Sequence, residues 1–165
     1  MRHSVDYSFP MGYEHNPARE PLPSAASEAL VSAWYRMQVQ NAHLLQRLAV
    51  EHELNPIDLR ALKFLGVDEA PRTPKELATF LQVGSSLVSA VIERLESRQF
   101  IRRAPNPQDR RSTLLHLDHC GSRVVEQLRS LYGRALSGLF GHPDQDAIVT
   151  ATNQIEEGLR DAASF

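Results

Sequence analysis

Apolar residues recur at helical spacing along most of the chain, and the first long run begins near residue 25. Its positions are separated by alternating steps of four and three residues, with one polar asparagine among them: Leu30, Trp34, Met37, Asn41, Leu44 and Leu48. This spacing predicts a helix whose apolar seam packs against another helix. Residues 1–24 hold four prolines and few aliphatic residues, so we expect a poorly ordered arm there.

A second helix is predicted from Pro56 to Gly66. Asn55 is expected to cap it, and Pro56 suits the first helical position because no amide hydrogen is needed there. Leu54 is expected to pack against Leu59 across this start.

Two helices and a turn follow. Thr73-Pro74-Lys75-Glu76 has the form of a capping box, in which Thr73 and Glu76 each accept the backbone N–H of the other. We expect this helix to end near Gly84, because a glycine can supply the turn into the next helix. That next helix carries an apolar stripe expected to face the core: Leu87, Val88, Val91, Ile92 and Leu95. Two helices joined in this way form a helix-turn-helix.

After Gln99 the pattern changes from helical to alternating. Residues 100–103 and 112–117 are predicted to form the arms of a β-hairpin around a tip rich in proline, asparagine and aspartate. Asp109 and Arg111 stand two residues apart, so the carboxylate is expected to orient the guanidinium. We therefore predict a mainly helical fold with a small hairpin wing, a winged helix-turn-helix.

Such a unit can read duplex DNA, with the second helix in the major groove and wing arginines on phosphate or in the minor groove. The formal net charge is −2, yet residues 72–111 hold eight Lys and Arg against four Asp and Glu, which leaves −6 elsewhere. Positive charge is thus concentrated on the predicted reading unit. The predicted DNA contacts are Thr73, Lys75, Ser85, Ser86, Ser89, Arg94, Arg103, Asp109, Arg110 and Arg111.

Several of these contacts also have an ordinary structural interpretation. The serines could be surface residues at a helix start, and Arg94 could pair with Glu93 at the surface, which contributes little. Asp109 and Arg111 could merely stabilise a turn. Arg102 and Arg103 lie on opposite faces of a strand, so at most one of them is expected to face DNA.

The chain resembles the MarR family of bacterial transcriptional regulators. The motifs that carry the resemblance are residues 59–62, 73–78, 85–89 and 92–96, Arg102-Arg103, residues 109–112, and Leu117 and Asp118 followed by Gly121. The chain departs from the family at Gln99, where glycine is usual, at Gly84, where serine is frequent, and at Asp118, where threonine is common. The resemblance implies a dimer that regulates transcription, and we expect a repressor released by a small-molecule effector.

Helices at both ends carry more apolar surface than one small winged helix needs. We expect residues 25–54 and 119–165 to form a homodimer around the DNA-binding region, residues 55–118, within one domain that follows the arm. A two-fold protein predicts a palindromic operator read at points about 10 base pairs apart. A small aromatic effector is expected in a cleft lined by Trp34, His43, Leu62 and Phe64.

Other functions are weaker alternatives. His116, Asp118, His119 and Cys120 include metal-ligating and thiol side chains, so a metal-responsive or redox-responsive regulator using His116, His119 and Cys120 stays open. The winged helix could instead be a protein-interaction module. No catalytic motif is recognisable, so we predict no enzyme, no metal site and no cofactor. One cysteine, no apolar run of membrane length and no secretion signal favour a cytoplasmic protein.

Overall fold

The computed structural model describes residues 25–67 and 70–162, so the predicted arm lies outside the described residues. The chain divides into two units, residues 1–41 and residues 42–165, and the boundary falls inside helix α1 (Ala25–Glu51). Within the first unit, the described part of α1 exposes large apolar side chains: Leu30, Val31, Tyr35, Met37 and Val39.

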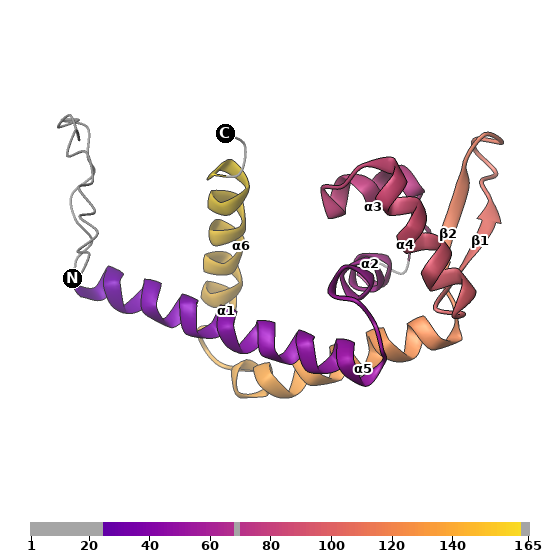
Figure 1. Ribbon diagram of the computed structural model, residues 1–165. Helices are drawn as coiled ribbons and strands as arrows, with labels where there is room; N and C mark the ends of the chain where they lie inside the picture. The colour runs from indigo at the N-terminus through magenta and orange to yellow at the C-terminus, as the bar shows by residue number, and fades with distance from the viewer. Residues whose placement is uncertain (1–24, 68–69, 163–165) are drawn as a thin grey trace, which may run out of the picture. The chain divides into compact units, whose positions relative to one another are not determined.

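The second unit contains the predicted winged helix-turn-helix, which confirms the fold class (Figure 1). After the end of α1, the helices are α2 (Pro56–Gly66), α3 (Pro74–Leu81), α4 (Ser85–Ser97), α5 (His119–Leu136) and α6 (Gln145–Ala162), with a short 3-10 turn, η1 (Ser137–Leu139), between the last two. The hairpin consists of β1 (Ile101–Pro105) and β2 (Thr113–Leu117).

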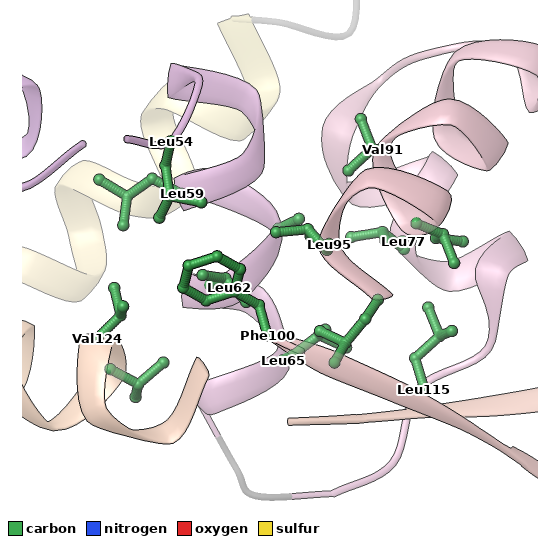
Figure 2. Close-up of a cluster of buried hydrophobic side chains, with 14 of the residues drawn as sticks. Leu54, Leu59, Leu62, Leu65, Leu77, Val91, Leu95, Phe100, Leu115 and Val124 are labelled. Carbon is green, nitrogen blue, oxygen red and sulfur yellow. The ribbon is translucent and has the colours of Figure 1, made fainter. Parts of the chain in front are cut away.

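One apolar core holds α2, α3, α4, the hairpin and the first half of α5 together (Figure 2). Leu62, Leu77, Leu95 and Leu115 are fully buried in it, and they come from four different elements. Burying each such side chain stabilises the fold by about 1.5 to 3 kcal/mol. The core therefore fixes the positions of α4 and the wing relative to each other.

The hairpin is antiparallel, with Ile101 opposite Leu117 and Pro105 opposite Thr113. A third segment extends its base, because Arg72 and Leu115 exchange two backbone hydrogen bonds of 2.7 and 3.2 Å. The chain that enters α3 is thus tied to β2, which links the helix-turn-helix to the wing.

The start of α5 contacts the base of the wing through the residues of the Leu-Asp-x-x-Gly motif. The Asp118 carboxylate accepts the His119 N–H at 2.7 Å and the Asp118 N–H donates to the Phe100 carbonyl at 2.9 Å. A Cβ on Gly121 would clash with that same carbonyl oxygen. The motif's glycine is therefore required by a close backbone contact.

Three helices end on a left-handed residue that is not glycine: Glu53 (φ 53°), Gln82 (φ 56°) and Gln99 (φ 58°). In each case the N–H of the left-handed residue and the N–H of the next residue donate to the last carbonyls of the helix, as in the pair Gln99 N–H to Glu96 and Phe100 N–H to Leu95. The prediction that Gly84 makes the turn after α3 is wrong, because Gln82 makes it. Gly84 instead caps α4 in an extended conformation, with φ −69°.

Two smaller predictions also need correction. Asn55 occupies the cap position of α2, but its side chain makes no capping hydrogen bond, so Pro56 alone favours the helix start. Leu87 was expected in the buried stripe of α4, yet it is 45% exposed while Val88, Val91, Ile92 and Leu95 are at most 3% exposed. Four stripe residues fill the available core surface, and Leu87 lies beside it.

Candidate nucleic-acid interface

The entry to α3 has the predicted capping box. The Thr73 hydroxyl accepts the Glu76 N–H at 3.2 Å, and the Glu76 carboxylate accepts the Thr73 N–H at 2.7 Å and the Thr73 hydroxyl at 2.8 Å. These bonds from the Thr73 backbone and side chain lower the pKa of Glu76. Thr73 is thus engaged in the helix cap, whereas Lys75 on the next turn is exposed.

The exposed side of α4 consists of small and hydroxyl-bearing residues. Ser85, Ser86, Ser89 and Ala90 are exposed, on the side opposite the buried stripe. Side chains this short allow the helix backbone to come close to another surface, and the hydroxyls can donate and accept hydrogen bonds. The predicted reading serines therefore lie together on one helical surface.

Arg94, predicted to contact phosphate, is bound to Asp58 of α2 instead. Its Nε donates to Asp58 Oδ2 at 2.8 Å and its Nη2 donates to Oδ1 at 2.6 Å. The Asp58 side chain is 1% exposed and that of Arg94 is 35% exposed. The pair raises the pKa of Arg94. Because a buried carboxylate requires a partner, the guanidinium is held against α2.

Arg98, the residue that follows α4, anchors this helix to the α1–α2 turn. Its guanidinium donates to the carbonyls of Glu53 at 2.6 Å and His52 at 3.1 Å, and it lies 5.1 Å from the centre of the Phe100 ring. The same turn is tied to α5, since His52 Nε2 lies 2.8 Å from Gln127 Oε1. Arg94 and Arg98 together fix the orientation of α4 in the fold.

The two arginines of β1 point to opposite faces, as predicted. Arg103 pairs with Glu96 of α4, with 3.2 Å between its Nε and the carboxylate, and both side chains are 40% exposed. Arg102 lies opposite His116 on the other face. Burial and the nearby Arg102 charge lower the pKa of His116.

The wing tip is ordered by hydrogen bonds between its own residues. Asp109 Oδ1 accepts the backbone N–H of Arg111 at 2.9 Å, so it fixes the turn and not the guanidinium as predicted. Asn106 donates to the Ser112 hydroxyl at 2.8 Å across the tip. Arg110 and Arg111 are exposed, and neither forms an ion pair with any residue that the structure describes.

A shallow hollow of about 360 Å³ lies on the wing, with basic and hydroxyl side chains at its rim. Arg103, Arg110, Ser112 and Thr113 contribute its polar groups. The arrangement offers hydrogen-bond donors and positive charge to an anionic backbone, which suits the phosphates of a nucleic acid.

The four predicted effector residues do not share one environment. Leu62 is a core residue with 0% exposure, so it presents no surface to a ligand, and His43 is exposed on α1. Phe64 stacks on Phe80 with 4.4 Å between ring centres, beside an open hollow of about 520 Å³ that Lys75 also lines. Trp34 belongs to the first unit.

The possible metal-binding or redox-active residues are also separated by the fold. His116 is on β2, whereas His119 and Cys120 begin α5, with Cys120 half-buried against the core. In residues 25–67 and 70–162, no three His, Cys, Asp or Glu side chains are arranged to hold a metal ion. None of the helices in the described part of the chain has the length and apolar character that a membrane span requires.

Comparison with known proteins gives a consistent picture. Residues 52–112, from the α1–α2 turn to the wing, match the model of the MarR family. The multiple antibiotic resistance protein MarR of Escherichia coli is 32% identical over 87 residues, which cover 50% of the chain and 60% of that protein. The transcriptional repressor NicR of Pseudomonas putida is 23% identical over 121 residues, 72% of the chain and 76% of that protein.

A solved structure of FabT from Streptococcus pneumoniae, in complex with DNA, shares the fold with a TM-score of 0.61 at 18% identity, and the match covers 81% of the chain and 99% of FabT. The chain spans about half the length of two of the curated relatives, 46% of one and 60% of MarR. On the family model and the curated relatives, one of which is 31% identical over 66% of its own length, the chain belongs to the MarR family of transcriptional regulators.

Proposed function

We propose that the chain regulates transcription by binding duplex DNA sequence-selectively, with α4 in the major groove and the wing tip over the backbone or in the minor groove. The observation that carries the proposal is the pairing of an exposed serine surface on α4 with two wing-tip arginines, Arg110 and Arg111, that form no ion pair with a described residue. Serine hydroxyls suit base edges and guanidinium groups suit phosphates. FabT, which shares this fold, was solved with DNA bound.

The proposed contacts are a reduced set of those expected from the sequence. Lys75, Ser85, Ser86, Ser89, Arg110 and Arg111 are retained because their side chains are exposed. Three residues of the expected set position the contacts instead of making them. They are Thr73 in the cap of α3, Asp109 in the wing tip, and Arg94 in its pair with Asp58. Arg103 sits at the edge of the interface, where its pairing with Glu96 competes with DNA.

The acting form is proposed to be a homodimer. Large apolar side chains from the end of α5 through α6 are exposed in the single chain: Leu136, Phe140, Val149 and Leu159. Exposed apolar surface of this extent favours association, and a two-fold dimer would read a palindrome with its two α4 helices about 10 base pairs apart.

Repression with release by an effector completes the proposal. The name of NicR identifies that relative as a repressor, and bound protein can block access to a promoter. A small aromatic molecule is the effector class that suits the hollow beside Phe64 and Phe80, because the rings offer apolar contact and its lining also offers one charge of each sign, from Lys75 and Glu76. Such a ligand releases DNA only if it binds the DNA-free form more tightly.

The test begins with selection of preferred duplexes from a random library, followed by titration of the best sequence and a scrambled one at several salt concentrations. We expect a palindromic preference, at least about a thousandfold over the scrambled duplex, and affinity that falls as salt rises. Sedimentation should give a dimer alone and one dimer per duplex. Equal affinity for all sequences, or no binding to DNA, would reject the proposal in favour of a protein-interaction module.

The effector is tested separately by thermal-shift measurements with aromatic carboxylic acids, with and without the selected duplex. A ligand that stabilises the free protein and lowers DNA affinity supports release. The matched variant is Lys75→Met, which keeps the aromatic pair and removes the charge. Because Lys75 is also a proposed DNA contact, this variant is compared only by the thermal shift that the ligand produces in the DNA-free protein. Ligands that bind equally to free and DNA-bound protein would leave the hollow without a regulatory role.

A further inference from the structure

We infer that Leu87 is a specificity-determining residue that recognises the C5 methyl group of one thymine in each half of the operator. This inference rests on the proposed function, because it names what one position of α4 reads. The starting observation is the exposure of Leu87, which is 45%, on a helix whose other large aliphatic residues are at most 3% exposed.

Leu87 is set apart from its neighbours by size. The exposed residues around it in the first two turns of α4 are Ser85, Ser86, Ser89 and Ala90, all small. A surface that approaches this end of α4 therefore meets the leucine side chain before it meets the backbone. Leu87 cannot fold back into the core, since Val88 and Val91 already fill the adjoining buried positions.

The position of Leu87 around the helix gives it a separate part of the reading surface. With 3.6 residues in each turn, Leu87 and Ser89 lie about 160° apart around the helix axis, and Ser86 and Ala90 lie between them. Arg94 lies about two turns after Leu87 on the same side of the helix. Asp58 holds it against α2. The edge of the reading surface at Leu87 is therefore apolar, and the edge at Ser89 is hydroxyl-bearing.

The major groove has one apolar group among its base edges, the C5 methyl of thymine. When leucine packs against that methyl group, apolar surface of both the protein and the base is removed from water. Against the N7 and O6 of guanine or the amino group of cytosine, the same side chain would remove water and return no hydrogen bond, which costs free energy. Leu87 therefore favours thymine at the base it faces, and the serines read other bases by hydrogen bonding.

Deoxyuridine provides a direct test because it pairs like thymidine and lacks only the methyl group. Each thymine of the selected duplex is replaced singly by deoxyuridine, and the affinities of the wild type and of Leu87→Ala are measured. For the wild type, one position in each half-site should lose affinity about fourfold, the factor that corresponds to about 0.8 kcal/mol for one buried methyl group. For Leu87→Ala the loss at that position should disappear.

Two further variants separate recognition from folding. Leu87→Met keeps an apolar side chain of similar size and should keep the discrimination between thymine and deoxyuridine. Ser86→Ala should alter base preference elsewhere in the half-site and also keep that discrimination. Thermal melting checks that Leu87→Ala is folded, as expected for an exposed position.

The outcomes distinguish the inference from the function on which it rests. If the wild type has no preferred duplex, the proposed function fails. If it has one, but deoxyuridine has the same effect on the wild type and on Leu87→Ala at every thymine, the role of Leu87 is overturned and DNA recognition stands.

Discussion

Arg94 on α4 and Asp58 on α2 form an ion pair with two hydrogen bonds, of 2.6 and 2.8 Å, although the two residues are 36 positions apart in the sequence. The carboxylate is 1% exposed, so it is almost removed from water and depends on Arg94 for its hydrogen bonds. The pair joins the helix proposed to enter the major groove to the helix that lies at the centre of the core.

Removing the arginine should therefore destabilise the fold more than removing an exposed arginine. We expect Arg94→Ala to lower the free energy of unfolding by about 3 kcal/mol, because it leaves an unpaired buried carboxylate. Arg60→Ala, an exposed position on α2, should change it by less than about 0.5 kcal/mol. Urea denaturation of both variants is the measurement. Equal stabilities for the two would show that the pair does not contribute.

The double variant Asp58→Leu with Arg94→Met distinguishes a need for the charges from a need for packing. Apolar residues of similar volume often replace a buried ion pair without loss. We expect this variant to recover most of the lost stability. A double variant as unstable as Arg94→Ala would contradict that expectation.

The wing-tip arginines should act on DNA affinity and not on folding. Arg111→Ala is expected to lower affinity for the selected duplex at least about tenfold, since a hydrogen bond from a charged group contributes about 1.5 to 3 kcal/mol. Asp109→Ala should have a smaller effect, because it removes the bond that holds the Arg111 backbone in the tip. Fluorescence anisotropy titrations measure both variants, and Arg60→Ala serves as the control. Wild-type affinity for Arg111→Ala would remove the wing from the mechanism.

The capping box at the start of α3 should make part of the stability depend on pH. The Thr73 contacts lower the pKa of Glu76 below its ordinary value of 4.5. The ionised carboxylate therefore stabilises the fold above that value, and the contribution is lost as the pH falls through the lowered pKa of the folded state.

Glu76→Gln isolates this contribution. The stability difference between the wild type and the variant should be largest near neutral pH and shrink as the pH is lowered to about 3. Urea denaturation across that range is the measurement. Thr73→Ala should cost about 1 kcal/mol at neutral pH, and Thr73→Ser should retain most of the cap. If the stability difference between the wild type and Glu76→Gln does not change with pH, ionisation of Glu76 does not contribute to the stability of the fold.

Gln99 should be a position where glycine stabilises the fold. Its φ of 58° is unfavourable for a residue with a Cβ atom, at a cost of roughly 1 kcal/mol. We expect Gln99→Gly to raise the melting temperature. Gln46→Gly, in an exposed position within α1, should lower it, because glycine weakens a helix interior by about 0.5 to 1 kcal/mol. A lower melting temperature for Gln99→Gly would show that its side chain contributes contacts that outweigh the backbone cost.

The local patterns were sufficient to predict the elements of the second unit. The capping box located the start of α3, and the change to alternating residues after Gln99 located the hairpin. Both signals depend on residues that lie close together in the sequence. The ends of helices were less predictable, because Gln82 and Gln99 adopt left-handed conformations that propensity assigns to glycine.

The site was predicted less completely, because side-chain partners are set by tertiary contacts. Arg94 finds Asp58 and Arg98 finds the carbonyls of the α1–α2 turn only when the chain has folded. One signal was available in the sequence, since Asp58 lies between the apolar Ile57 and Leu59 in a helix rich in leucine. A charged residue in that setting indicates a buried pair, and the guanidinium of a neighbouring helix is its natural partner.

The Phe100 carbonyl accepts the Asp118 N–H and lies against Gly121, so the root of the wing and the first turn of α5 form one block. In that block α5 cannot rotate or slide without carrying the hairpin with it. A displacement of α5 in a dimer would thus become a change in the distance between the two wings while the interior of each chain stayed unaltered. In the proposed dimer, the spacing of the two sets of DNA contacts would follow such a displacement of α5.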